Sequence, residues 1–282
     1  MPHSRKIIRF IKLTDMLWGV GDMNKPKVVI LCGGKGTRLR EHTEFIPKAL
    51  VKVGDMPVIW HVMKTYSHYG YKDFVLCLGY KGDMIKEYFL NLEFMENDFT
   101  LSLKSKAEKI IAHEPKLEDW NITFADTGLE TPTGGRAKKI EKYIKDETFF
   151  LTYCDGLSNV DINKLYKFHK QKGKIATLTA GHPTSRFGII GINNGIAISF
   201  KEKPYMEGVI NGGFFVFNRK VFDYLDNNSV LEEEPLRKLT KEGQLAVYEH
   251  KNFWGCMDTF KDVEMFNSMW DKNNRPWVIW KD

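Results

Sequence analysis

The chain has 282 residues, of which 42 are Lys or Arg and 36 are Asp or Glu, so its formal net charge at pH 7 is +6. With 43% hydrophobic and 13% aromatic residues it can bury a large core, which excludes an intrinsically disordered protein. No stretch approaches 18 apolar residues, so we expect no membrane-spanning helix.

The excess of basic residues is concentrated at the N-terminus. Residues 1–27 contain six Lys or Arg and only two Asp, whereas the rest of the chain is nearly balanced. A nearly neutral body argues against a nucleic-acid-binding face. Residues 1–26 are interpreted as a loosely ordered N-terminal extension, and Arg9 and Lys12 interrupt the apolar run that a secretory signal needs.

The first half of the chain alternates predicted strands and helices. Residues 27–32 and 74–78 are short apolar runs, typical of buried strands. Pro57 and Gly70 bracket a predicted helix, and a second short helix is expected over 83–90. A further strand is predicted at 148–153, followed by a helix that Asp161 caps and Gly173 ends.

The second half is richer in β-structure. Three apolar runs between 174 and 200 are separated by turn residues, and Asn193-Asn194-Gly195 predicts a hairpin. A strand follows Gly212-Gly213, and helical segments are expected near 219–225, 231–241 and 260–270. Buried strands alternating with helices predict an α/β fold with a mixed, mostly parallel sheet covered by helices on both faces. We expect a single domain over 27–282, with 91–120 as an excursion from the sheet, a small β-rich region and a C-terminal helical segment.

The four cysteines do not form a recognisable metal or disulfide pattern. Cys32, Cys77, Cys154 and Cys256 are widely spaced and include no C-x-x-C pair. Most of them are interpreted as small buried hydrophobic residues, and a reducing, cytoplasmic compartment is expected.

A glycine-rich loop, Gly33-Gly-Lys-Gly-Thr-Arg-Leu39, directly follows the first predicted strand. Glycines allow backbone N–H groups to approach a phosphate, and Arg38 adds a planar cation. The loop is not a dinucleotide-binding fingerprint, because Leu39 occupies the third glycine position, and it lacks the Gly-Lys-Ser/Thr of a Walker A loop.

Further charged residues extend this candidate phosphate site. Lys48 follows Pro47 and offers a second cation, so that the two motifs together predict a polyphosphate clamp. Asp155 follows the strand at 148–153 and Asp258 follows the apolar run Phe253-Trp-Gly-Cys-Met257. Carboxylates at strand ends are suited to Mg²⁺.

Three weaker motifs remain. Glu202-Lys203-Pro204 follows a predicted strand, Gly134-Gly135-Arg136 opens a predicted helix, and Asn211 precedes two glycines. The free N–H groups of a helix start favour an anion or a hydroxyl, and a small amide beside glycines can read sugar hydroxyls.

Together these motifs resemble the sugar nucleotidyltransferase family, and within it the cytidylyltransferase branch. The resemblance runs from about Lys27 to the C-terminus. Besides the glycine loop and Pro47-Lys48 it includes the segments W-H-V-M-K-T-Y-S-H-Y-G (60–70), G-Y-K-G (79–82), D-T-G with T-G-G-R (126–136), V-I-N-G-G-F-F-V-F (209–217), Glu234-Pro-Leu236 and F-W-G-C-M-D-T (253–259).

The resemblance implies a Rossmann-like fold, a Mg²⁺ cofactor and a homo-oligomer. It implies transfer of the CMP moiety of CTP to a sugar 1-phosphate, expected to be glucose 1-phosphate, with release of pyrophosphate. Arg38, Lys48 and Asp155 are implied as catalytic residues, and Asp155 and Asp258 as metal ligands. The implied nucleotide site comprises Gly33, Gly34, Gly36, Thr37, Arg38, Lys48, Asp126, Thr127 and Gly128. The implied sugar-phosphate site comprises Thr133, Gly134, Gly135, Arg136, Gly188, Glu202, Lys203 and Asn211.

The chain also departs from the pattern of this branch. Ile46-Pro47-Lys48-Ala49 stands where Lys-Pro-Lys-Pro is frequent, Cys154 replaces a glycine, and Cys32 replaces a common alanine. These departures leave a changed sugar open. The same reaction with UTP or dTTP, and a non-catalytic sensor of nucleotide sugars, also stay open at the level of the sequence.

Overall fold

A seven-stranded sheet forms the centre of the molecule. The computed structural model describes residues 25–39, 43–102, 109–113, 117–183, 185, 187–202, 204 and 208–280. The strand order is β14-β10-β13-β8-β1-β4-β7. Within the sheet β13 runs antiparallel to β10 and β8, and the other neighbours pair in parallel, which confirms the expected mixed, mostly parallel sheet. The strands are β1 (Val28–Leu31), β4 (Asp73–Leu78), β7 (Asn121–Asp126), β8 (Thr148–Tyr153), β10 (Ala176–Gly181), β13 (Ile210–Asn218) and β14 (Leu245–His250).

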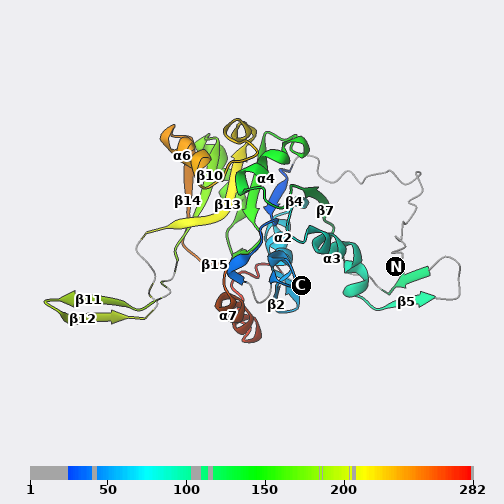
Figure 1. Cartoon of the computed structure of the whole chain (residues 1–282), viewed down its shortest axis with the longest axis horizontal. Helices are drawn as coiled ribbons and strands as arrows, with labels where there is room; N and C mark the ends of the chain where they lie inside the picture. The colour runs from blue at the N-terminus through cyan, green and yellow to red at the C-terminus, as the bar shows by residue number, and fades with distance from the viewer. Residues whose placement is uncertain are drawn as a thin grey trace.

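Helices cover both faces of this sheet (Figure 1). They are α2 (Val58–His68), α3 (Gly82–Met95), α4 (Thr133–Lys139), α5 (Ile162–Lys172), α6 (Glu234–Lys241) and α7 (Phe260–Asp271). Short 3-10 turns are η1 (Thr37–Leu39), η2 (Lys48–Leu50), η3 (Glu141–Tyr143) and η4 (Arg219–Tyr224). Small two-stranded pairs join β2 (Lys52–Val53) to β3 (Met56–Pro57), and β9 (Gly156–Ser158) to β15 (Trp254–Cys256).

Strand β1 contributes side chains to two hydrophobic cores, one on each face of the sheet. Val28 and Ile30 face a cluster that includes residues of α2, α5 and α7, whereas Val29 and Leu31 face a second cluster with residues of α4, η4 and α6. Successive side chains of a strand point to opposite faces, so an uninterrupted apolar run requires cover on both sides. All four residues are buried, and each contributes roughly 1.5–3 kcal/mol relative to exposure.

Local sequence signals set the ends of several elements. Asp161 caps α5 by accepting a hydrogen bond from the backbone N–H of Lys164, and Gly173 ends it with φ +60°. Asn194 and Gly195 both have positive φ between β11 (Ile189–Asn193) and β12 (Ile196–Lys201), as expected for a tight hairpin turn. The helix expected over 83–90 is longer and runs from Gly82 to Met95, with Leu92 buried in the additional part.

Two hairpins project from the body on opposite sides (Figure 1). One is β11–β12, and the other pairs β5 (Phe99–Ser102) with β6 (Lys109–Ala112) within the expected excursion at 91–120. The β-rich stretch from 174 to 217 is therefore divided, because β10 and β13 join the central sheet while β11 and β12 stand apart.

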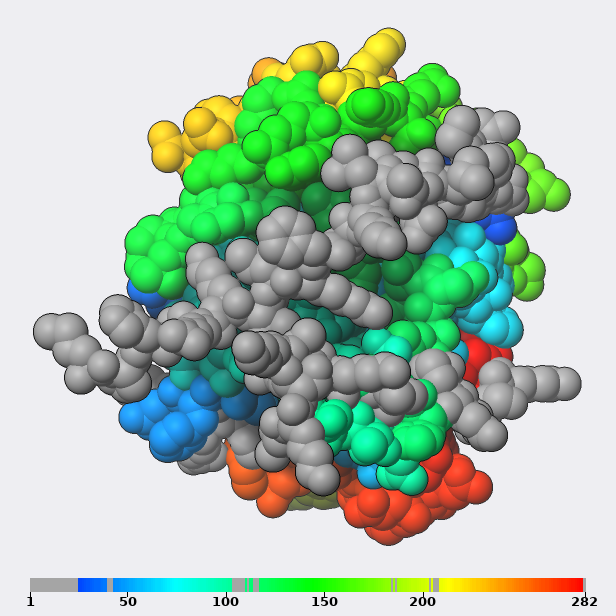
Figure 2. Space-filling model, turned by 90° about the vertical axis from the view of Figure 1, so that its right-hand side faces the viewer, coloured from blue at the N-terminus to red at the C-terminus, as the bar shows by residue number. Residues whose placement is uncertain are grey.

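The C-terminal part and the 120–145 segment lie at different ends of the face that Figure 2 shows. The segment around 120–145, in green, covers the upper part of the face seen in Figure 2, and the C-terminal residues, in orange to red, lie at its lower end. Among the described residues, none of the helices has the length and apolar character needed to cross a membrane.

Candidate functional site

Most of the predicted site residues lie at one edge of the sheet. Strands β1, β4, β7 and β8 are mutually parallel, so the glycine loop, Gly79, Thr127 and Asp155, which follow them, lie at the same edge. Because β13 is antiparallel to β8, Asn211 near its start lies at this edge too. Ligands of open α/β sheets bind outside the carboxyl ends of the strands.

The glycine loop is shaped by close contacts as well as by open space. Gly36 adopts φ +60°, and a Cβ there would lie 2.8 Å from Cγ2 of Thr43. The hydroxyl of Thr43 hydrogen-bonds the carbonyls of Gly36 and Leu39. A Cβ on Gly34 would meet nothing within 4 Å, so this part of the loop leaves room for a ligand.

Lys48 lies between the two predicted metal ligands. Its Nζ atom is 2.5 Å from Oδ2 of Asp155 and 3.0 Å from Oδ1 of Asp258. Arg38 donates from Nη1 to Oδ2 of Asp258 at 2.7 Å, while most of its own side chain, 77%, is exposed. Four residues predicted from separate motifs therefore form one charged cluster.

The contacts in this cluster favour the charged forms of Lys48 and Asp258. Burial by itself lowers the pKa of Lys48, but the carboxylates of Asp155 and Asp258 outweigh burial and raise that pKa above its ordinary value. Burial raises the pKa of Asp258, and hydrogen bonds from Arg38 and Lys48 more than reverse this, leaving the pKa below its ordinary value. The site thus carries fixed charges of both signs at neutral pH.

A small antiparallel pair positions the two aspartates. Cys256 of β15 lies opposite Gly156 of β9, and the backbone N–H of Met257 donates to the carbonyl of Asp155 at 2.9 Å. Asp258 does not cap the following helix. That role belongs to Thr259 and Asp262, which form a capping box at the start of α7.

The aspartates are suited to a divalent metal ion that also binds substrate. No cluster of three or more His, Cys, Asp or Glu side chains able to hold a metal occurs in the described ranges. Mg²⁺, however, is usually bound by one or two carboxylates, with waters and substrate phosphates completing its coordination. Asp155 and Asp258, converging on one ammonium group, fit that donor set.

Arg136 is buried and holds three loops together. Its guanidinium donates to the carbonyls of Gly33, Leu78, Gly128 and Leu129 and to the hydroxyl of Thr127. Only 4% of the residue is exposed, and a Cβ on Gly33 would lie 2.2 Å from its Nη1. Any side chain larger than glycine at position 33 would therefore collide with Arg136. The Arg136 guanidinium holds in place the loops that the sequence predicts to bind the nucleotide.

The neighbouring predicted residues also have defined partners. Asp126 accepts a hydrogen bond from the backbone N–H of Gly128, and Thr127 is buried. The N–H of Gly135 donates to the carbonyl of Ser229, and a Cβ there would lie 2.2 Å from the carbonyl oxygen of Asn227. The N–H of Gly135 is thus already used inside the protein.

Two residues that the sequence reasoning missed connect the predicted sugar residues. Tyr153 donates its hydroxyl to Oε1 of Glu232, and Thr133 donates to Oε2 of Glu232 at 2.7 Å. Asn211 donates from Nδ2 to the Tyr153 hydroxyl at 3.3 Å. The Glu234-Pro-Leu236 segment stands out in the sequence, but no spacing rule marks Glu232 two residues earlier.

The remaining sugar residues lie on the β11–β12 hairpin or outside the described structure. Glu202 follows β12 at the base of the hairpin, and a Cβ on Gly188 would contact its carboxylate at 3.0 Å. Lys203 lies outside the described residues. The structure thus brings Gly188 and Glu202 together with each other.

The departures from the family pattern are accommodated by the core. Cys154 is 7% exposed, so its side chain turns inward, and burial raises the pKa of its thiol well above the ordinary value. Ala49 is buried as well. All four cysteines are free, as expected.

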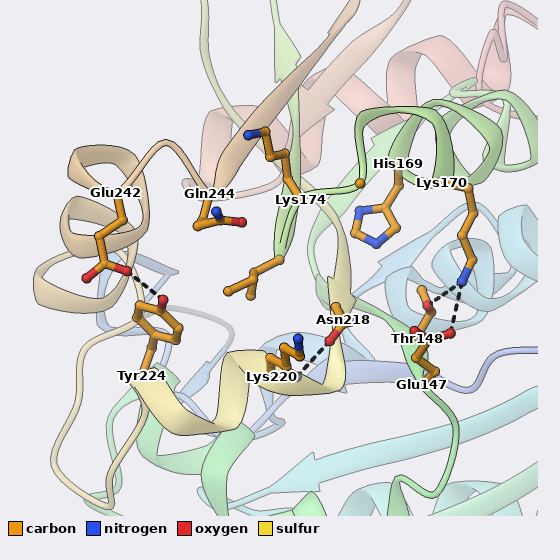
Figure 3. Close-up of a pocket in the computed structure, with 12 residues that line it drawn as sticks. Glu147, Thr148, His169, Lys170, Lys174, Asn218, Lys220, Tyr224, Glu242 and Gln244 are labelled. Atoms are coloured by element: carbon orange, nitrogen blue, oxygen red, sulfur yellow. Dashed lines mark hydrogen bonds and ion pairs between the residues drawn. The ribbon is translucent and has the colours of Figure 1, made fainter.

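A separate hollow of about 620 Å³ lies at the opposite edge of the sheet (Figure 3). It is lined by the first residue of β8, Thr148, by the last residue of β13, Asn218, and by Gln244 just before β14. These positions are at the other ends of the strands that carry Asp155 and Asn211, so the hollow is not part of the charged cluster.

Comparisons with known proteins show the family of the chain. The sequence profile of the nucleotidyl transferase family matches residues 27–276. A probable glucose-1-phosphate cytidylyltransferase of Bacillus subtilis is 48% identical over 256 residues, which cover 90% of this chain and all of that protein. The glucose-1-phosphate cytidylyltransferase of Salmonella typhimurium is 46% identical over 258 residues, with the same coverage.

Solved structures share the fold at lower sequence identity. HddC from Yersinia pseudotuberculosis superposes with a TM-score of 0.64 at 22% identity, covering 87% of this chain and all of that one. A putative glucose-1-phosphate thymidylyltransferase from Bacillus anthracis gives a TM-score of 0.64 at 19% identity, covering 91% and 98% of the two chains. These likenesses support the fold assignment.

Proposed function

The chain belongs to the nucleotidyl transferase family, and on this basis we propose that it transfers the CMP moiety of CTP to glucose 1-phosphate, forming CDP-glucose and pyrophosphate. Support comes from the two cytidylyltransferases that match it at 46–48% identity over their whole length. The single structural observation behind the proposal is the contact of Lys48 with both Asp155 and Asp258 at the carboxyl edge of the sheet.

The proposed chemistry needs charge neutralisation and alignment. A phosphate oxygen of the sugar 1-phosphate attacks the α-phosphorus of CTP, and the bond to pyrophosphate breaks. The attacking oxygen is already anionic at neutral pH, so the reaction requires no general base. The protein must hold two mutually repelling anions in line, and fixed cations in a partly buried site do this.

The charged cluster supplies these groups. Arg38 is the most exposed member, so its guanidinium is free to contact the triphosphate on the side away from Asp258. Lys48 is largely buried and its raised pKa keeps it protonated, which places a permanent cation beside Asp155. Both residues are proposed to bind the triphosphate and the departing pyrophosphate.

Members of this family generally use a divalent metal, and we propose Mg²⁺ held by Asp155 and Asp258. When bound, the ion neutralises phosphate charge and orients the reacting groups. The protein side chains provide the two carboxylates. Lys48 contacts both of them, and Arg38 holds Asp258.

The loops held by Arg136 are proposed to surround the cytosine. The buried guanidinium ties Gly33 to Thr127 and Gly128, next to Gly34 and Asp126 in the chain. Backbone groups held in this way can recognise a base edge without reorganising on binding.

We also propose that the protein is a cytoplasmic homo-oligomer in which the β11–β12 hairpin forms a subunit contact. Ile192, Ile196 and Ile198 are 68–71% exposed, and Ile190 and Phe200 are exposed as well. A two-stranded hairpin with apolar residues exposed on both faces is only marginally stable in water, so a second protein surface is expected to cover it.

The proposed activity is tested with the full chain, CTP, Mg²⁺ and glucose 1-phosphate. Pyrophosphate and CDP-glucose should form in equal amounts, and UTP and dTTP should compete poorly. If the enzyme preferred UTP or dTTP, that nucleotide would replace CTP as the proposed substrate. No pyrophosphate from any sugar 1-phosphate would instead support a binding protein without catalysis.

A further inference from the structure

Glu232 is an exposed carboxylate whose orientation is nevertheless defined. The hydroxyl of Tyr153 donates to its Oε1 atom, and the hydroxyl of Thr133 donates to its Oε2 atom at 2.7 Å. An exposed glutamate ordinarily samples several rotamers, and holding it by both oxygens costs side-chain entropy. This arrangement is typical of a group positioned for a ligand.

The partners of Glu232 are neutral, so its charge is not compensated by them. No ion pair joins Glu232 to a Lys or Arg in the part of the chain that the structure describes. A carboxylate has about four acceptor sites, and the two hydroxyl groups use only two of them. The other acceptor sites of the carboxylate can bind further hydrogen-bond donors.

The hydroxyl of Tyr153 connects Glu232 to Asn211. It donates to Glu232 and accepts from Nδ2 of Asn211. Asn211 is fixed in turn, because its Oδ1 accepts a hydrogen bond from the N–H of Gly213.

This network lies beside the charged cluster. Tyr153 is the last residue of β8 and is two positions before Asp155, while Asn211 lies in the adjacent strand β13. Thr133 begins α4, whose Arg136 holds the nucleotide loops. Through Tyr153 and Thr133, Glu232 is therefore connected to the strand end that leads to Asp155, to Asn211 and to the start of α4.

We infer that Glu232 is a sugar-specificity residue, whose carboxylate accepts hydrogen bonds from hydroxyl groups of the sugar 1-phosphate while Tyr153 and Thr133 hold it in place. This inference rests on the proposed function. A carboxylate repels the phosphate end of the substrate and attracts hydroxyl donors, so it orients the sugar ring toward itself and the phosphate toward the charged cluster that is proposed to bind the triphosphate.

The test compares Glu232→Gln with the unmodified protein and with Glu233→Gln. Glu233 is the adjacent exposed glutamate, and no hydrogen bond of its side chain is found among the described residues, so this variant is a matched control. Glucose 1-phosphate and analogues that each lack one hydroxyl are assayed with saturating CTP and Mg²⁺. Melting temperatures verify that each variant is folded, and Glu232→Asp is a second variant that keeps the charge.

For glucose 1-phosphate we expect Glu232→Gln to lower kcat/KM by roughly 10- to 100-fold, the value of a charge-assisted hydrogen bond. The KM for CTP should be unchanged, and Glu233→Gln should behave like the unmodified protein. With the unmodified protein, kcat/KM for one deoxy analogue should be lower than that for glucose 1-phosphate by a similar factor. With Glu232→Gln, removal of the same hydroxyl should lower kcat/KM little further, because both changes remove the same hydrogen bond. The kcat/KM of Glu232→Asp should lie between those of the unmodified protein and Glu232→Gln.

An equal loss for every analogue, or a loss of CTP affinity, would contradict the inference, since a purely structural role predicts such uniform effects. Unchanged kcat/KM for glucose 1-phosphate in Glu232→Gln would also contradict it, while leaving the proposed function intact. If the unmodified protein itself turned over no sugar 1-phosphate, the proposed function would fail and the sugar role of Glu232 with it.

Discussion

The ammonium group of Lys48 lies 2.5 Å from the carboxylate of Asp155, although the two residues are remote from each other in the sequence. The same ammonium contacts Asp258, whose second oxygen is bound by Arg38. A single cation thus connects the glycine-loop side of the site to both proposed metal ligands. This relationship makes Lys48 the most informative residue to change.

Lys48→Met should reduce kcat/KM by ~10²–10³-fold, because the site loses a preorganised cation and leaves Asp155 and Asp258 repelling each other. Steady-state pyrophosphate release measures the effect. Lys52→Met is the control, since Lys52 is exposed and its side chain makes no ion pair within the described structure. A similar loss in both variants would mean that general destabilisation, rather than the cluster, is responsible.

Asp258→Asn should raise the Mg²⁺ concentration needed for half-maximal activity by about 10-fold or more, because one of two anionic ligands is lost. Titration of activity with Mg²⁺ at saturating CTP gives this value. Asp271→Asn, at the exposed end of α7, should leave the titration curve unchanged. A normal Mg²⁺ requirement in Asp258→Asn would remove this residue from the metal site.

Arg136→Lys should lower the free energy of unfolding by about 2–4 kcal/mol. An ammonium cannot reach the five oxygens that the planar guanidinium bonds, so buried carbonyls lose their partners. Urea unfolding followed by tryptophan fluorescence measures the change. Arg237→Lys on the exposed side of α6 serves as the control and should differ little from the unmodified protein.

Two buried histidines should make the protein less stable in mild acid. Burial lowers the pKa of His61 and of His169 to about 4, from an ordinary value of 6.5. Between these pH values the unfolded chain binds protons that the folded chain does not, so the free energy of unfolding falls as pH decreases from 6.5 toward 4. Each histidine contributes up to ~3 kcal/mol to this fall.

Urea midpoints measured from pH 7.5 to pH 4.5 test this expectation. His169→Gln preserves the possibility of a hydrogen bond to Thr177 but cannot titrate, so its stability should depend less steeply on pH. An identical pH dependence in the variant and the unmodified protein would exclude His169 as a source of the effect.

Charges on the β11–β12 hairpin should dissociate the proposed oligomer. Ile192→Lys combined with Ile198→Lys places two ammonium groups on an exposed apolar surface, and light scattering after gel filtration should then report a smaller particle. Val247→Lys, at an exposed apolar position of β14 in the body, should leave the mass unchanged. A monomeric mass for the unmodified protein would contradict the proposed subunit contact.

Much of the fold follows from local patterns in the chain. The apolar run at 28–31 required cover on both faces, Asp161 and Gly173 marked the ends of a helix, and Asn194-Gly195 marked a hairpin. Each of these signals acts through neighbouring residues, by the period of a strand or by a backbone conformation. The position of Asp155 after β8 was likewise evident, because strand ends can be located in a sequence.

Tertiary structure alone decided which of these residues meet and what each side chain does there. Lys48 contacts Asp155 and Asp258 because β9 pairs with β15 and brings distant segments together. Arg136 follows a glycine pair that suggested a ligand, yet its guanidinium binds protein carbonyls inside the core. Glu232 has no recognisable motif, and its hydroxyl partners come from β8 and α4. Sequence periodicity records whether a side chain is buried or exposed, whereas the identity of its partner depends on the register and packing of segments that are remote in the chain.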